Sequence, residues 1–265
     1  MQTFVKYLAM LLLSLIGLGT AGVANASPTI LINDANGSLV SYDTATKVST
    51  VLSTTCDTMY DIALNPGGDL YGVDGGTLYR ISTASGATTM LGSLGSFVNG
   101  LVFGADGTLY GSGDSNLYKI NTTTGVASLV GAMGKMQSAG DLAFFKGQLY
   151  LASDLGLAVV NTTTGVASLI GGTSNIFGLA STADALFGVM GTSIYNINPT
   201  TGVGVAVASY KGSSAYGAAS IPTPTAIPTP TSVPEPATWA MLLLGLVLVG
   251  IVLRRRQTAP RAAFA

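Results

Sequence analysis

The chain of 265 residues is 48% hydrophobic and 9% charged, and its net charge is −1. It has no histidine, which excludes a Ser-His-Asp triad, a Cys-His pair and a histidine-ligated zinc or copper site. The composition is compatible with one sizeable packed domain. The absence of histidine excludes many hydrolase mechanisms and many metal sites.

Residues 1–26 have the pattern of a cleaved secretory signal peptide. Lys6 supplies a positive charge, an apolar run of 12 residues follows at Tyr7–Leu18, and Ala24 and Ala26 flank Asn25 as an A-x-A site. We expect export through the Sec machinery. The competing interpretation is an uncleaved anchor helix, although the run is shorter than the ~20 residues that span a bilayer.

Residues 27–220 form a repeat array. The string NTTTGVASL occurs at residues 121–129 and again at 161–169. Aligning on the glycine of this turn gives Gly86, Gly125, Gly165 and Gly202, which lie 39, 40 and 37 residues apart, and Lys47 stands 39 residues before Gly86. The spacing defines about five units of ~39 residues.

Each unit contains four short apolar runs separated by Gly, Asp, Asn and Thr. In the second unit these runs are DIALN, DLYGV, TLYRIS and ATTMLG. Four strands per repeat of about 40 residues is typical of a β-propeller blade. The first unit lacks its innermost strand, and the segment Tyr216–Ser220 is left over at the end of the array.

We therefore predict an all-β, five-bladed propeller that closes by pairing its N- and C-terminal strands. An open β-solenoid, or a ring of six or seven blades with irregular members, also agrees with the spacing. The repeat unit is similar to units of bacterial secreted propeller proteins, and this similarity implies the fold rather than an activity.

The innermost strands are expected to line a central channel. Asp61 and Asp141 each open such a strand, at the position that Gly100, Gly178 and Gly217 occupy in the other units. Carboxylates, an amide and aromatic rings near one channel mouth are suited to hold a sugar or a peptide. The candidate ligand-binding residues are Tyr60, Asp61, Asn99, Asp141, Phe177 and Tyr216. In the competing interpretation, the aromatic residues close the cores between blades and the aspartates accept hydrogen bonds from free backbone donors.

The other aspartates predict turns rather than a catalytic site. The array carries six basic and eleven acidic side chains, a net charge of −5, which argues against nucleic-acid binding. Most of these aspartates lie beside Gly, Asn or Ser, where the carboxylate accepts hydrogen bonds from the turn backbone. We expect no cofactor. Structural calcium is the competing interpretation, and the single cysteine, Cys56, is expected to be a loop residue without an intramolecular disulfide.

The C-terminal part begins with a linker. Residues 221–232 interleave proline with threonine and favour an extended, semi-rigid stalk. Residues 237–253 are uncharged and long enough for one transmembrane helix, and a short tail, predicted to be cytoplasmic, occupies residues 257–265. By the positive-inside rule the arginine cluster between them stays in the cytoplasm; it consists of Arg254, Arg255 and Arg256.

One more motif stands directly before this helix. Pro234, Glu235 and Pro236 precede the apolar run, which ends at the three arginines. This order over residues 233–256 resembles the PEP-CTERM sorting signal of Gram-negative, matrix-forming bacteria. The resemblance implies recognition by a membrane-embedded exosortase, cleavage near the Pro-Glu-Pro tripeptide, and transfer from the inner membrane to the cell surface or extracellular matrix.

These features favour a non-enzymatic surface protein. We expect an exported propeller that serves as a binding or scaffold domain, associated with exopolysaccharide, biofilm or surface proteins. The alternative is a calcium-dependent propeller lyase or lactonase that acts on extracellular polymers through aspartates and a metal-bound water. That alternative predicts Asp and Asn oxygens that converge at the channel mouth.

Overall fold

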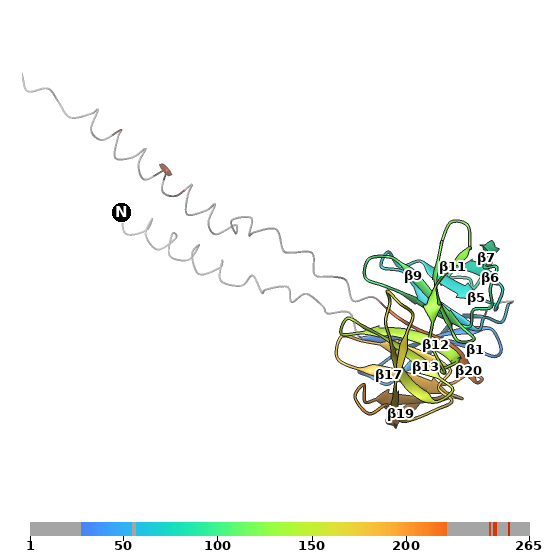
Figure 1. The fold of residues 1–265 in the computed structure, drawn as a ribbon. Coiled ribbons are helices and arrows are strands. Elements are labelled where there is room, and N and C mark those ends of the chain that lie inside the picture. The colour runs from blue at the N-terminus through green and yellow to red at the C-terminus, as the bar shows by residue number, and fades with distance from the viewer. Residues whose placement is uncertain (1–27, 55–56, 222–243, 245, 248–253, 255–265) are drawn as a thin grey trace, which may run out of the picture. The chain divides into compact units, whose positions relative to one another are not determined.

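A computed structural model describes residues 28–54 and 57–221, together with residues 244, 246, 247 and 254. The first two ranges form one compact unit, which Figure 1 shows as a ring of small sheets. The predicted signal peptide, Cys56, residues 222–232 of the linker, the Pro-Glu-Pro tripeptide and all but a few residues of the predicted C-terminal helix lie outside the described residues. Among the described residues, no helix reaches the length and apolarity that crossing a membrane requires.

The described residues contain five antiparallel sheets of four strands each, so the prediction of five blades is confirmed. Blade 1 contains β20 (Ala215–Ser220), β1 (Thr29–Asp34), β2 (Ser38–Asp43) and β3 (Ser49–Thr54). Blade 2 contains β4 (Asp61–Leu64), β5 (Leu70–Val73), β6 (Thr77–Ile81) and β7 (Thr88–Ser93). Blade 3 contains β8 (Gly100–Phe103), β9 (Leu109–Gly113), β10 (Asn116–Ile120) and β11 (Ala127–Ala132).

The last two blades repeat the same order of strands. Blade 4 contains β12 (Ser138–Phe145), β13 (Gln148–Ser153), β14 (Gly156–Val160) and β15 (Ala167–Gly171). Blade 5 contains β16 (Gly178–Ser181), β17 (Leu186–Met190), β18 (Ser193–Ile197) and β19 (Gly204–Ser209). The strands β20, β4, β8, β12 and β16 contact one another around the axis and are therefore the inner strands.

Blade 1 joins the two ends of the ring. Strand β20 pairs antiparallel with β1, with Ile30 opposite Ser220 and Ile32 opposite Ala218 (Figure 1). The leftover segment at Tyr216–Ser220 thus supplies the inner strand that the first unit lacks, as predicted. This pairing excludes the open solenoid, and the five sheets exclude a ring of six or seven blades.

The core is divided among the five interfaces between neighbouring blades. Each hydrophobic cluster takes its members from two adjacent sheets; for example, Ile62 and Leu70 of blade 2 pack with Leu31, Leu39 and other residues of blade 1. The remaining interfaces have equivalent clusters. Inner and second strands are therefore covered on both faces, which explains their short, nearly continuous apolar sequences.

The Thr-Thr-Gly turn joins the third strand of a blade to the fourth. In blade 3, Asn121 Oδ1 accepts hydrogen bonds from the backbone N–H groups of Thr123 and Thr124, and Gly125 adopts a φ of 79°. A Cβ on Gly125 would lie 2.6 Å from the carbonyl carbon of Gly92 in blade 2. Glycine is required here both for its positive φ and for the close approach of the neighbouring blade.

Candidate functional site

Five equivalent positions, one on each inner strand, surround the axis of the ring. Three are glycines, and their backbones approach the neighbouring strands closely: a Cβ on Gly217 would lie 2.7 Å from Asp61 Cα, and one on Gly100 would lie 3.2 Å from Asp141 Cα. Asp61 and Asp141 therefore occupy positions around the axis that are equivalent to those of the three glycines, as the alignment of the repeats predicts. One detail differs, because β12 begins at Ser138 and Asp141 does not open its strand.

The two aspartates at the axis accept hydrogen bonds from the backbone of all five blades. Asp61 Oδ1 accepts from the N–H of Ile62 at 2.7 Å, and Asp61 Oδ2 accepts from that of Leu101 at 2.5 Å. In every blade the donor is the residue that follows the axis position. The three N–H groups that Asp141 accepts belong to Leu142 at 2.5 Å, Leu179, and Ala218 at 3.0 Å.

Both carboxyl groups are fully removed from solvent, with 0% of either residue exposed. Burial raises the pKa of Asp61 well above its usual range, and the nearby Asp141 raises it further by its charge and by the hydrogen bond between the two side chains. Burial also raises the pKa of Asp141, but the hydrogen bond from Asp61 and the three backbone N–H groups oppose that shift.

This burial bears on the two interpretations of Asp61 and Asp141 that the sequence leaves open. They could present carboxylates to a ligand at the channel mouth, or they could accept hydrogen bonds from free backbone donors of the inner strands. They lie inside the ring, where backbone N–H groups occupy their oxygens. The two aspartates hold the blades together, and their oxygens are not accessible to a ligand at the mouth.

We refer to the residues directly before the axis positions as the channel mouth. Tyr60 is 46% exposed and Phe177 is 42% exposed, while Tyr216 is half-buried with its ring centroid 6.4 Å from that of Tyr60. Asn99 is half-buried and donates its amide N–H to the carbonyl oxygen of Ser138 at 3.1 Å, which ties blade 3 to blade 4. The fifth of these positions is Gly140.

One further aromatic residue belongs to this mouth and was not predicted. Phe97 is 44% exposed, and its ring centroid lies 5.9 Å from that of Tyr60 in an edge-to-face arrangement. A Cβ on Gly75 would lie 3.0 Å from both rings, so this glycine allows them to meet. Phe97 lies in the loop before β8, outside the repeated register. Its position two residues before Asn99 was the one signal in the sequence that could have pointed to it.

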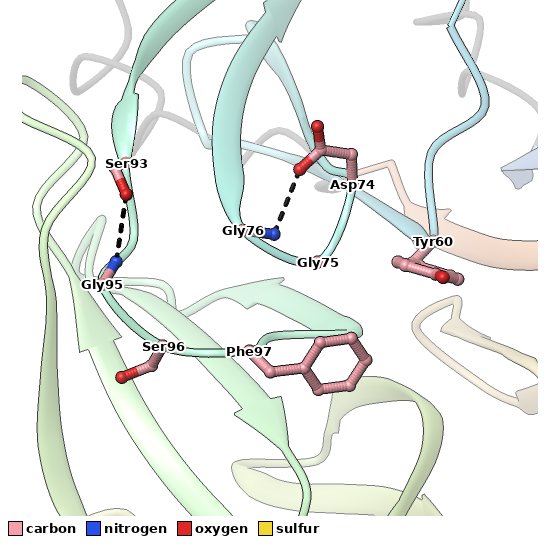
Figure 2. Close-up of a pocket in the computed structure, with 8 residues that line it drawn as sticks. All are labelled: Tyr60, Asp74, Gly75, Gly76, Ser93, Gly95, Ser96 and Phe97. Atoms are coloured by element: carbon pink, nitrogen blue, oxygen red, sulfur yellow. Dashed lines mark hydrogen bonds between the residues drawn. The ribbon is translucent and has the colours of Figure 1, made fainter.

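Tyr60 and Phe97 border a surface hollow of about 510 Å³ (Figure 2). Figure 2 shows the two rings beside the turn at Gly75, with Asp74 above this turn and the hydroxyl of Ser96 on the other side of Phe97. Asp74 is engaged within its own blade, because it accepts hydrogen bonds from the N–H of Gly76 and from the hydroxyl of Tyr79. The hollow is thus lined by two aromatic faces, glycine backbone and serine hydroxyls.

No set of three or more His, Cys, Asp or Glu side chains within residues 28–54 and 57–221 is arranged to hold a metal ion. Several aspartates instead accept hydrogen bonds from turns: Asp34 Oδ1 accepts from the N–H groups of Asn36 and Ser38, and Asp106 Oδ1 from that of Thr108. These bonds agree with the expected turn role. Structural calcium stays an untested prediction.

Comparisons with known proteins identify a sorting motif and the fold. A family model described as the PEP-CTERM protein-sorting motif matches residues 232–256, and no curated protein matches the chain. A chain of the nidogen/laminin complex has 13% sequence identity and a TM-score of 0.51, over 72% of this chain and 97% of that chain. This likeness shows the propeller fold alone.

Two further solved structures are similar at lower TM-scores. One concerns the de novo evolutionary emergence of a symmetrical protein, with 22% identity and a TM-score of 0.49 over 72% of this chain and 93% of that chain. The other is a structural genomics protein of unknown function from Bacteroides thetaiotaomicron, with 14% identity and a TM-score of 0.46 over 72% and 60% of the two chains. The chain therefore combines a five-bladed β-propeller with a C-terminal PEP-CTERM protein-sorting motif.

Proposed function

We propose that this protein is an exosortase-sorted surface protein whose propeller binds extracellular polysaccharide through its aromatic channel mouth. The PEP-CTERM motif implies export and processing by an exosortase. The final destination at the cell surface or in the matrix, cleavage near Pro234 to Pro236, and the polysaccharide ligand are the parts of this proposal that go beyond the motif.

The observation that carries the binding proposal is the group of exposed rings at one end of the channel. Tyr60, Phe97 and Phe177 each expose more than two fifths of their surface, and Tyr216 joins them from blade 1. Exposed aromatic residues gathered on one face mark interaction sites, since their burial would otherwise stabilise the fold. Rigid flat rings beside hydroxyl and backbone groups suit the alternating apolar and polar faces of sugar rings.

The chemistry of the hollow also favours a neutral ligand. Its lining contains one carboxylate, that of Asp74, and this group is already bonded to its own turn and to Tyr79. The rest of the lining is uncharged. A hydrated, weakly charged polymer would therefore meet aromatic faces and serine hydroxyls without a strong electrostatic barrier.

No observation favours the alternative of a lyase or lactonase over this proposal. That alternative relies on Asp and Asn oxygens that converge at the mouth. Asp61 and Asp141 are buried with their oxygens occupied. Asn99 donates its amide N–H to Ser138, and its Oδ1 is buried without a hydrogen bond. These three residues therefore do not offer the accessible, convergent oxygens on which the alternative relies.

The binding proposal is tested with the full-length chain in detergent and exopolysaccharide purified from the producing cells. The double variant Tyr60→Ala/Phe97→Ala is expected to weaken binding about tenfold, the equivalent of ~1.4 kcal/mol. A matched control is Leu129→Ala, which removes a 63% exposed side chain from the outer strand β11. Equal binding by the double variant and the control would refute the assignment of the mouth, and no binding by the wild type would refute the ligand class.

A further inference from the structure

The axis of the ring brings backbone hydrogen-bond donors from every blade to two carboxyl groups. Five backbone N–H groups, one from each blade, end on the four oxygens of Asp61 and Asp141. The two side chains are also hydrogen-bonded to each other. A bond between two carboxyl groups requires a proton on one of them, because two carboxylates have only acceptors.

The surroundings of the two side chains differ and indicate which one carries the proton. Asp141 accepts hydrogen bonds from three backbone N–H groups. Asp61 accepts only two N–H groups. A donor-rich site stabilises a carboxylate, so the negative charge is better placed on Asp141.

An unpaired acceptor lies on the Asp61 side of the axis. Asn33 Oδ1 is buried and accepts no hydrogen bond, while the Asn33 amide N–H donates to the carbonyl oxygen of Met59 at 2.7 Å, which fixes the orientation of the amide. A Cβ on Gly217 would lie 2.0 Å from Asp61 Oδ1 and 2.9 Å from Asn33 Oδ1. Both oxygens thus border the Gly217 position, and an unpaired acceptor oxygen on this side of the axis disfavours a charged Asp61 and is compatible with a neutral carboxylic acid.

We propose that Asp61 and Asp141 share a single proton, held on Asp61, and that this acid–carboxylate pair is a pH-sensitive lock that joins the five blades across the channel. In the locked form, Asp61 donates to Asp141, and the single negative charge of Asp141 faces the convergent N–H groups. Loss of the proton leaves two buried carboxylates side by side without the bond between them. The blades then lose a link at the axis, and the ring is destabilised.

Among the described residues, the inner strands around the pair carry no other charged group. The five inner strands carry one more titratable side chain, Tyr216, whose ring lies at the mouth beside Tyr60. At the end of β1, Asp34 is bonded to the N–H groups of Asn36, Ser38 and Ser213. The tyrosines of the second strands lie in the clusters between blades; they are Tyr71, Tyr110 and Tyr150.

The direction of the pH effect follows from the raised pKa of Asp61. In the unfolded chain this group loses its proton near pH 4, whereas the folded ring retains it to higher pH. The folded state therefore binds more protons than the unfolded state above about pH 4, and stability falls as pH rises through the folded pKa. The contribution of the Asp61 proton is therefore fully present in acid and is lost in alkali.

The test compares three variants of the full-length chain in detergent: Asp61→Asn, Asp141→Asn and, as a control, the exposed Asp184→Asn. Infrared spectra at neutral pH are expected to show the carbonyl band of a protonated carboxyl group in the wild type and in the control, and to lack it in Asp61→Asn. Calorimetric unfolding at about pH 6, in buffers with different heats of ionisation, should release one proton more from the wild type than from Asp61→Asn.

The placement of the proton is tested by the two axis variants against each other. Asparagine at position 61 retains a donor toward Asp141, whereas asparagine at position 141 puts an NH2 group against backbone N–H donors. Asp141→Asn should therefore have the lower thermal midpoint. A missing carboxyl band in the wild type, a band that persists in Asp61→Asn, or a lower midpoint for Asp61→Asn would each overturn the proposal.

Discussion

The channel and its mouth are one residue apart along each inner strand, yet their chemistry is opposite. At the axis, Asp61 and Asp141 are fully buried and bonded to backbone from every blade. One position earlier, Tyr60 and Phe177 expose their rings. The difference shows that the axis contributes to stability. Because we propose that the mouth contacts a ligand, changes at the two levels should have separable effects.

The largest expected effect is on stability, from removal of a carboxylate at the axis. Asp141→Ala would leave three buried N–H groups without an acceptor, and each unsatisfied group costs about 1–3 kcal/mol. We expect a loss of roughly 3–9 kcal/mol in the free energy of unfolding, measured by urea denaturation. A change of similar size in the control Asp74→Ala, at the mouth, would contradict the separation of the two levels.

The second prediction concerns the space around the axis. Gly217→Ala places a Cβ 2.0 Å from Asp61 Oδ1, so the strands must move apart. We expect a destabilisation of about 1–3 kcal/mol, as for other overpacked sites. Gly76→Ala is the matched control, because nothing lies within 4 Å of its Cβ position. Equal stability of the two variants would show that the axis is less closely packed than described.

The third prediction separates axis and mouth by pH. Because the raised pKa of Asp61 gives the folded state an extra proton above about pH 4, the thermal midpoint of the wild type should decline between mildly acidic and alkaline pH. The profile of Asp61→Asn should be flatter over the same interval, and that of Tyr60→Ala/Phe97→Ala should follow the wild type. Parallel profiles for the wild type and Asp61→Asn would contradict the assignment.

The smallest expected effect lies far from the axis, in the turn of blade 1. Lys47 has a φ of 62°, where the equivalent turns have glycine. Lys47→Gly removes the steric cost of this conformation and should raise stability by about 0.5–1 kcal/mol, without effect on polysaccharide binding. The midpoint of chemical denaturation measures this gain in stability. The opposite change, Gly125→Lys, should destabilise the fold, because its Cβ would meet the backbone of Gly92.

Much of the fold was predictable because the repeat is strict. The steps of 39, 40 and 37 residues set the blade size, and the segment at Tyr216–Ser220 predicted the closing pair that β20 and β1 form. The register also placed Asp61 and Asp141 on the inner strands. These inferences depend on local pattern and on the symmetry of the ring.

A backbone-bonding role of the aspartates was one interpretation of the sequence, but their partners in other blades were not predictable. Their partners are backbone N–H groups, one of them 77 residues away, and a backbone donor has no signature in residue type. Phe97 was missed because the path of its loop, rather than the repeat, brings it beside Tyr60. Contacts between blades therefore determine which residues form the site. These contacts depend on the folded ring and cannot be read from the repeat spacing of the sequence.

The central claim is that the propeller is delivered to the cell surface by its sorting motif. The most direct measurement is the intact mass, with the C-terminal peptide, of the protein recovered from the surface of its native cells. The account predicts a chain that begins near Ser27 and ends between Pro234 and Pro236. A surface protein that still ends at Ala265 would contradict processing by an exosortase and leave a propeller on an ordinary C-terminal anchor.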